Sequence, residues 1–315
     1  MPATVELDAQ YRQLREECGL LERPGRGAID VLGPDAAEYL QGQLTNDVEA
    51  LGVGEGQYAA LLDRKGHMQT DLRVLRVAAD AILLDTEPET KDAALRHLTM
   101  YSIGRDVAVG DATAERAFVS LIGPRAAEVA GTPPLPEFAN EATKVAGVDV
   151  LAVGTRDGID LLLPPDERER VVGALLDAGA VEVSPEAVEI LRVERGVPRF
   201  GAEMDAGTMP AEAAIVEDAV SFTKGCYIGQ ETVARLHYKG RPNRHLRGLR
   251  LSGAAAPGAA LRLGDKEVGT LGGAVVSPAL GPIGLAIVRR EAEPGTQLTV
   301  GEDGVTAEVV ALPFG

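Results

Sequence analysis

The sequence predicts an α+β protein in which two related split-βαβ-like domains are followed by a small antiparallel β-barrel. A Gly-Pro-x-Ala-Ala-Glu hexamer occurs at residues 33–38 and again at 123–128, each time between an apolar strand-like run and a helical run. Both copies are followed by the same order of further strands and a second helix. From about residue 246, short apolar runs alternate with Gly and Pro roughly every eight to twelve residues, as in small antiparallel barrels.

The first domain is expected over residues 1–115. Residues 28–40, "AIDVLGPDAAEYL", predict a strand that ends at Gly33 and a helix with Pro34 at its first position. Three strand-like runs follow within residues 56–86, and "ETKDAALRHLTMY" has the composition of a helix. This order of elements predicts one complete α+β unit.

The second domain is expected over residues 116–245 and the barrel over residues 246–315. Residues 118–130 repeat the strand and helix, residues 143–163 predict further strands, and "PDERERVVGALLDAG" predicts a helix. The parallel with the first unit indicates an internal duplication. The alternative is coincidence, because Gly-Pro before a helix is a common device in an Ala-rich chain.

Composition limits the protein's class more than its function. The chain has 315 residues, and 45% of them are hydrophobic. This length exceeds the size at which a single hydrophobic core usually stops growing, so more than one domain is expected. A net charge of −17 opposes non-specific binding to nucleic acid or to an anionic membrane. No signal peptide or membrane span is expected, and the two cysteines fit a reducing compartment, so we expect a cytoplasmic protein in which Cys18 is structural.

The other cysteine, Cys226, lies in "FTKGCYIGQETVARL". If "IGQETVARL" is helical, Cys226 lies just ahead of the first turn, where the helix dipole and the nearby Lys224 would stabilise a thiolate. Gly225 and Gly229 would let a ligand approach the backbone closely. The alternative is that Cys226 is a small buried hydrophobic residue. Neither cysteine belongs to a Cys-x-x-Cys pair, so no self-contained metal site is expected.

Three further features carry candidate binding groups. Glu203 and Asp205 follow a helical run, and a carboxylate there could hold the N–H edge of a heterocycle, or could simply be solvated. Asp71 lies inside an alternating strand, where an acid is unfavourable unless it is exposed or has a task. Residues 235–250 contain six Arg or Lys and no acid, which is typical of a solvated connector or of an anchor for a polyanion.

Taken together, "KGCYIGQE", "RVERGVPRFGAEMD" and "LQGQLTNDV" closely resemble the YgfZ family of folate-binding proteins. That family is itself similar to the aminomethyltransferase (T-protein) of the glycine cleavage system, and the likeness runs over nearly the full chain. The resemblance implies a three-domain ring with a central channel for tetrahydrofolate. It also implies a monomer that assembles or maintains iron–sulfur enzymes, including enzymes that modify tRNA. Iron–sulfur client or assembly proteins are the implied partners, with no membrane and no direct tRNA contact.

Carried over by position, Glu203 resembles the acid that grips the pterin edge, and Asp71 resembles the aspartate that faces the reactive folate nitrogens in T-proteins. The resemblance makes Cys226 the reactive thiolate, tuned by Lys224. Gln230 stands where T-proteins tend to carry an arginine. The expected folate contacts around the thiol are Gly225, Tyr227 and Gln230.

Three functions follow from these expectations. The first is a tetrahydrofolate-binding accessory protein for iron–sulfur enzymes that uses Cys226. The second is an enzyme, a tetrahydrofolate-dependent aminomethyl or methyl transferase in which Asp71 positions or protonates a folate nitrogen. The third is an RNA-binding adaptor that uses residues 235–250.

Overall fold

A computed structural model describes residues 2–314 of the chain. The chain divides into two compact units. The first contains the residues up to Asp63 together with Gln69–Pro185 and Asp218–Ile228, and the second contains Arg64–Met68, Glu186–Glu217 and the residues from Gly229 onward. No helix within residues 2–314 is both long enough and apolar enough to cross a membrane.

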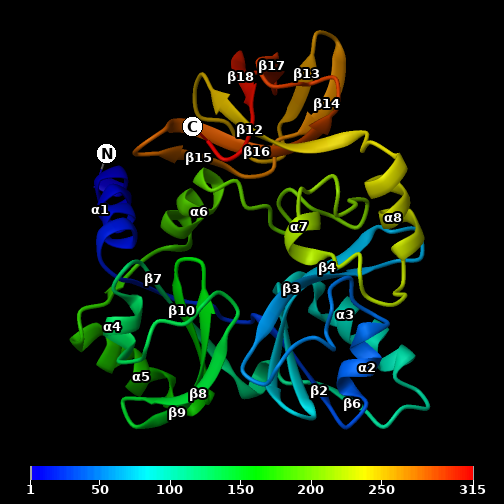
Figure 1. Ribbon diagram of the computed structural model, residues 1–315. Coiled ribbons are helices and arrows are strands. Elements are labelled where there is room, and N and C mark those ends of the chain that lie inside the picture. Colours follow the sequence, from blue (N-terminus) through cyan, green and yellow to red (C-terminus); the bar gives the residue numbers. More distant parts are fainter. Residues whose placement is uncertain (1, 315) are drawn as a thin grey trace. The chain divides into compact units, whose positions relative to one another are not determined.

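The first unit contains a five-stranded sheet in the order β3-β4-β5-β2-β6. Its strands are β2 (Gly27–Leu32), β3 (Gly56–Leu62), β4 (Met68–Ala78), β5 (Ala81–Thr86) and β6 (Ala108–Asp111). Its helices are α2 (Ala36–Gln41) and α3 (Pro88–Tyr101). Apolar residues of β2, β4 and β5 form one core with Tyr39 of α2 and Leu98 of α3, so the helices cover one face of this sheet (Figure 1).

A second sheet of the same unit has the order β11-β1-β7-β10-β9-β8. Its strands are β1 (Gly19–Glu22), β7 (Ala117–Ile122), β8 (Asn140–Val145), β9 (Val148–Thr155), β10 (Gly158–Leu163) and β11 (Val181–Glu182). The accompanying helices are α1 (Pro2–Glu16), α4 (Ala126–Ala130) and α5 (Arg168–Asp177). Strand β1 pairs with β7, so these N-terminal residues belong to the second sheet and not to the first, where the sequence had placed them.

The two copies of the hexamer fold alike. Gly33 and Gly123 both have φ of 128°, and a Cβ at either position would lie 2.4 Å from a backbone carbonyl oxygen. Only glycine suits such a position, which explains why the residue recurs. Pro34 lies in the turn and not at the first helical position, because α2 begins at Ala36. The predicted pair of related α+β units is confirmed in its order of elements.

The two sheets of the first unit pack face to face. Ala28, Leu75 and Leu83 of the first sheet form one apolar cluster with Phe118 and Leu162 of the second. Helices α2 and α3 cover the outer face of one sheet, and α4 and α5 cover the outer face of the other (Figure 1). The inner faces therefore form a protected layer in which charged side chains must find partners.

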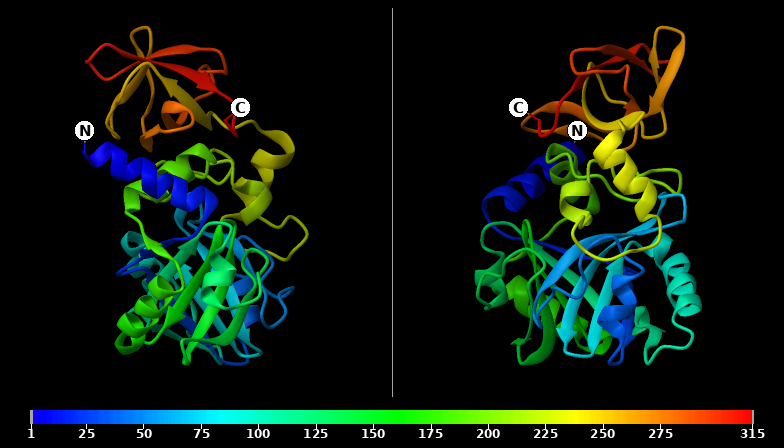
Figure 2. Two further views of the ribbon diagram at one scale, coloured as in Figure 1. Left: turned by 90° about the vertical axis from the view of Figure 1, so that its left-hand side faces the viewer. Right: turned by 45° about the vertical axis from the view of Figure 1, so that its right-hand side comes forward.

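The second unit contains the predicted barrel. Strands β12, β18, β17, β13, β14 and β16 pair in that order, and β16 pairs back with β12, so the six strands close (Figure 2). Strand β15 (Ala274–Ser277) pairs with β16. The barrel strands are β12 (Arg244–Leu251), β13 (Ala260–Leu263), β14 (Lys266–Thr270), β16 (Gly281–Arg289), β17 (Gln297–Val300) and β18 (Val305–Val310). The remaining helices include α6 (Pro185–Glu194), α7 (Val216–Ala219) and α8 (Gln230–Lys239). The domain boundaries and the ring with a central channel stay predictions.

Candidate functional site

Charged side chains line the layer between the two sheets of the first unit. Asp71 and Arg73 lie two residues apart on β4 and therefore on the same face of the sheet. Arg73 stands opposite Asp85 of β5 and donates from Nε to its Oδ2 at 2.8 Å. Nη1 of Arg73 lies 2.6 Å from Oδ2 of Asp160, which belongs to β10 of the other sheet. This ion pair joins the two sheets.

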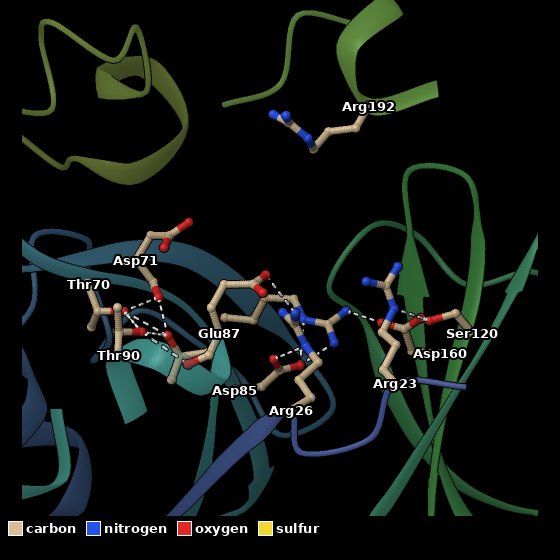
Figure 3. Close-up of polar contacts among 12 residues, drawn as sticks. Arg23, Arg26, Thr70, Asp71, Asp85, Glu87, Thr90, Ser120, Asp160 and Arg192 are labelled. Atoms are coloured by element: carbon tan, nitrogen blue, oxygen red, sulfur yellow. Dashed lines mark hydrogen bonds and ion pairs between the residues drawn. The ribbon is translucent and has the colours of Figure 1, made fainter. Parts of the chain in front are cut away.

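Two arginines before β2 complete the network. Arg26 pairs with Asp85 (Nε to Oδ1, 2.5 Å) and with Glu87 (Nη1 to Oε1, 2.9 Å). Arg23 donates from Nε to the hydroxyl of Ser120 at 2.7 Å, and Ser120 donates to Oδ1 of Asp160 at 2.6 Å (Figure 3). Three guanidinium groups thus face three carboxylates. We name this set the inter-sheet charge cluster, and its members are Arg23, Arg26, Arg73, Asp85, Glu87 and Asp160.

The carboxyl group of Asp71 is only partly satisfied. Oδ2 accepts a hydrogen bond from the Tyr58 hydroxyl at 2.7 Å, whereas Oδ1 is shielded from solvent and has no hydrogen-bond partner among the described residues. Burial raises the pKa of Asp71 above its usual range; the bond from Tyr58 opposes this shift, and the nearby Glu87 adds to it. A buried acceptor without a donor is costly, so Oδ1 is a polar atom whose hydrogen-bonding capacity the described residues leave unused.

A cluster of three buried threonine hydroxyls holds the backbone of Asp71. Thr86 donates to the Asp71 carbonyl at 2.6 Å, and Thr90 donates to the Glu87 carbonyl at 3.2 Å. The hydroxyl of Thr70 lies 2.7 Å from both of the other hydroxyls (Figure 3). These bonds connect β4, the end of β5 and the start of α3. They fix where the Asp71 carboxyl group stands relative to Glu87.

Lys224 does not have the environment that the sequence suggested. Its Nζ donates to the backbone carbonyls of Gln41 (2.6 Å), Leu44 (2.7 Å) and Asn46 (2.8 Å), which uses all three ammonium protons. Burial lowers the pKa of Lys224 to about 8. Lys224 therefore fastens its own segment onto the loop at residues 41–46, and its role as the tuner of a thiolate stays a prediction without support from these contacts.

Cys226 is exposed, as a reactive thiol must be. The helix that follows begins at Gln230, with Gly229 in a left-handed conformation at its N-cap, so it starts later than expected. Helix-dipole effects decline within one turn, and Cys226 lies outside the helix, so this source of thiolate stabilisation loses its structural basis. Tyr227 is buried and its hydroxyl has no partner among the described residues, while a Cβ on Gly225 would meet no atom within 4 Å. The catalytic role of Cys226 stays a prediction.

Glu203 lies in the second unit, and its carboxylate is fully engaged there. Arg192 donates to both of its oxygens at 2.8 and 3.0 Å, and the backbone amides of Arg199 and Gly273 donate at 3.0 and 2.6 Å. Each oxygen thus accepts two hydrogen bonds, which leaves no edge for a heterocycle. The role of Glu203 as a pterin ligand stays a prediction that these contacts do not support. They make it a brace between α6 and the barrel.

The basic run at residues 235–250 is partly used within the second unit. Arg244 pairs with Glu212 through Nε (2.9 Å) and Nη2 (2.7 Å), in a two-pronged contact. Residues 244–250 lie in β12, and residues 235–239 lie in α8. The run is therefore not a free connector, and its role as a polyanion anchor stays a prediction.

Several residues of the site were not predicted from the sequence. Arg73 follows Asp71 in the same alternating pattern, and that spacing was the available signal for a second charged group on the face. Arg23 and Arg26 sit in a turn, where charged residues are expected to be solvated.

Comparisons with known proteins cover nearly the whole chain. Residues 3–224 match the family described as the GCVT N-terminal domain, and residues 244–314 match the glycine cleavage T-protein C-terminal barrel domain. An aminomethyltransferase of Rubrobacter xylanophilus is 30% identical over 321 residues, which cover 98% of this chain and 86% of that protein. A putative chloroplastic transferase of Arabidopsis thaliana is 30% identical over 304 residues, which cover 91% of this chain and 69% of that protein.

A solved structure has the same fold. The crystal structure of the glycine cleavage system aminomethyltransferase T from Bartonella henselae matches with a TM-score of 0.89 at 24% sequence identity, covering 98% of this chain and 89% of that one. At this identity the likeness concerns the fold alone. Together with the family matches over both the N-terminal region and the barrel, the 30% identity to Rubrobacter aminomethyltransferase establishes that this chain belongs to the GcvT-like aminomethyltransferase superfamily.

Proposed function

We propose that this protein is a tetrahydrofolate-dependent one-carbon transferase, which moves an aminomethyl or methyl group with Asp71 at the reacting nitrogen. The observation that carries the proposal is the buried Oδ1 of Asp71, which has no partner among the described residues of a chain from this superfamily. Aminomethyltransferases of this family use tetrahydrofolate. A folate presents ring N–H groups, which are the kind of donor that the vacant carboxyl oxygen lacks.

Asp71 is suited both to position a nitrogen and to exchange a proton with it. Tetrahydrofolate supplies the nitrogen that carries the one-carbon unit. Oδ1 of Asp71 would accept the N–H, while Tyr58 holds the other carboxyl oxygen and so fixes the plane of the group. Because burial raises its pKa, Asp71 is nearer to proton-exchange equilibrium at neutral pH than a solvated aspartate. Thr86 restrains the Asp71 backbone, which supports a single orientation.

The test is transfer activity in the Asp71→Asn variant. The protein is incubated with tetrahydrofolate and a lipoyl-borne aminomethyl donor, and in parallel with an N-methyl donor, while folate product is measured. We expect kcat to fall by roughly 10²- to 10⁴-fold because asparagine cannot exchange a proton. The matched control is Asp149→Asn, an exposed aspartate of β9, which should keep full activity. Absence of product from both donors with the unaltered protein would refute the proposal.

A second candidate is the folate-binding accessory role in iron–sulfur protein maintenance that the YgfZ resemblance implies. The observation that favours it is the exposure of Cys226 next to the anchored Lys224, which presents the thiol to partners. A deletion strain complemented with Cys226→Ala distinguishes the two functions. Loss of iron–sulfur enzyme activity with Cys226→Ala but not with Asp71→Asn would favour the accessory role. Loss with Asp71→Asn but not with Cys226→Ala would favour the transferase.

A further inference from the structure

Arg23 is bound differently from the other two arginines of the inter-sheet charge cluster. Arg26 and Arg73 each pair with two carboxylates. Arg23 makes one side-chain hydrogen bond, from Nε to Ser120, while Asp160 acts on it only through its charge. Nε is thus the only nitrogen of Arg23 that donates to another described side chain, and the two terminal nitrogens are left over.

The terminal nitrogens of Arg23 remain accessible. The side chain is half-buried, and its terminal nitrogens are not among the polar atoms that are sealed without a partner. Burial lowers the pKa of Arg23, and the nearby Asp160 offsets that effect only in part. In Figure 3 the guanidinium of Arg23 and the carboxyl group of Asp71 point to the same side of the layer, at opposite ends of the network.

The two terminal nitrogens of Arg23 favour a carboxylate as their binding partner. A guanidinium whose two terminal nitrogens are free can form a pair of parallel hydrogen bonds with the two oxygens of one carboxylate. The cluster holds three cations and three anions, so it offers no surplus positive charge to balance a phosphate dianion. Ser120 and Asp160 fix the near edge of Arg23, which directs the far edge outward.

We infer that Arg23 is the carboxylate-recognition residue of this site and binds the acid group of a ligand in the layer that Asp71 also faces. This inference rests on the proposed function and names the chemical class that it takes: a carboxylate carried by the folate or by the one-carbon donor. Two ligands of the proposed reaction carry such a group. One is tetrahydrofolate, with its nitrogen at Asp71 and its glutamyl part at Arg23. The other is an amino-acid-type one-carbon donor such as N-methylglycine, which is too short to reach both residues and would bind at Arg23 beside the folate.

The test measures binding by calorimetry under anaerobic conditions with four probes. Tetrahydrofolate, 4-aminobenzoylglutamate and N-methylglycine carry the carboxylate in question. Tetrahydropteroate lacks the glutamyl part and ends in a benzoate carboxylate nearer to the pterin, and 4-aminobenzoylglutamate lacks the pterin. The variants are Arg23→Met and Arg23→Lys. Arg23→Lys keeps the positive charge but cannot form two parallel hydrogen bonds with one carboxylate. The matched control is Arg125→Met, because Arg125 is exposed and pairs with surface acids. Thermal unfolding checks that each variant folds, and Arg23→Lys carries the test if Arg23→Met does not.

Each outcome decides the assignment. If Arg23→Met weakens tetrahydrofolate binding by roughly 10- to 100-fold and leaves tetrahydropteroate unchanged, Arg23 binds the glutamyl carboxylate. If only N-methylglycine is weakened, Arg23 binds the donor. If all four probes stay within about threefold of the Arg125→Met control, the inference is wrong.

Failure of the proposed function would be visible separately. It would appear as absence of tetrahydrofolate and tetrahydropteroate binding to the unaltered protein. The two pterin-free probes would then decide the role of Arg23 by themselves. Absence of binding of both would overturn it, and binding that Arg23→Met weakens would support it.

Discussion

Replacing Lys224 with methionine should loosen the contact between residues 218–228 and residues 41–46 without changing the reactivity of Cys226. The ammonium group donates to three backbone carbonyls within 2.8 Å, and none of these bonds involves the thiol. Methionine fills similar space but donates no hydrogen bond. The segment would stay attached through its other bonds, such as that from the Ser221 amide to the Thr45 carbonyl at 3.0 Å.

The size of the effect follows from two opposed terms. Three charge-assisted hydrogen bonds contribute roughly 1.5–3 kcal/mol each. The cost of burying the ammonium opposes them, and the fall of the Lys224 pKa from 10.5 to about 8 puts that cost at about 3 kcal/mol. We therefore expect the free energy of local opening to fall by about 1.5–6 kcal/mol. Amide exchange in the two segments would then rise by roughly tenfold or more.

Hydrogen exchange read by mass spectrometry measures this opening, with Lys144→Met, an exposed lysine, as the control. The pH dependence gives a second check. Because the Lys224 pKa is lower in the folded protein, the unfolded chain holds more protons between pH of about 8 and 10.5. The unaltered protein should therefore gain stability relative to Lys224→Met across that range and show no change below it. Unchanged exchange together with slower alkylation of Cys226 would refute this reasoning and restore the thiolate-tuning role.

Three further predictions concern the site and its supports. Tyr58→Phe removes the hydrogen bond that favours ionised Asp71, so the pKa of Asp71 should rise further and the acidic limb of the pH–kcat/KM profile should move to higher pH. A profile that does not move would count against Asp71 as the titrating group. Arg73→Met should lower the free energy of unfolding by about 3–5 kcal/mol, because it leaves Asp160 buried without its main counter-charge. That loss should be smaller at pH 5 than at pH 8, since protonation removes the charge of the unpaired Asp160 carboxylate. Calorimetry at both pH values measures the loss of unfolding free energy, and an equal loss at both would contradict the prediction. Glu203→Gln should lower the melting temperature and leave tetrahydrofolate affinity within about threefold, and a loss of affinity with unchanged melting would return Glu203 to the folate site.

The sequence predicted the architecture where local rules govern it. Gly33 and Gly123 occur where the backbone needs a conformation that a side chain would block, so the repeated hexamer marked a repeated structure. The barrel was recognisable because short strands need frequent turns. The pairing of β1 with β7 was not predictable in this way, since a four-residue strand carries no signal for a partner about a hundred residues away.

For the candidate site, the sequence showed which residue was unusual for its position, but it did not show which side chains contact one another. Asp71 was recognisable because an acid inside an apolar strand needs a reason, and its carboxyl group is indeed held by Tyr58. The contacts of Lys224 could not be predicted because closeness to Cys226 in the chain does not determine where a long side chain points. Arg23 and Arg73 could be recognised only after the two sheets were seen to pack face to face.

The central claim is that the vacant oxygen of Asp71 holds the reacting end of a folate. A crystal structure of the protein with tetrahydrofolate bound, determined anaerobically, tests it most directly. The account predicts a folate N–H within about 2.7–3.2 Å of Oδ1 of Asp71. A folate bound elsewhere, with that oxygen still lacking a donor, would contradict it.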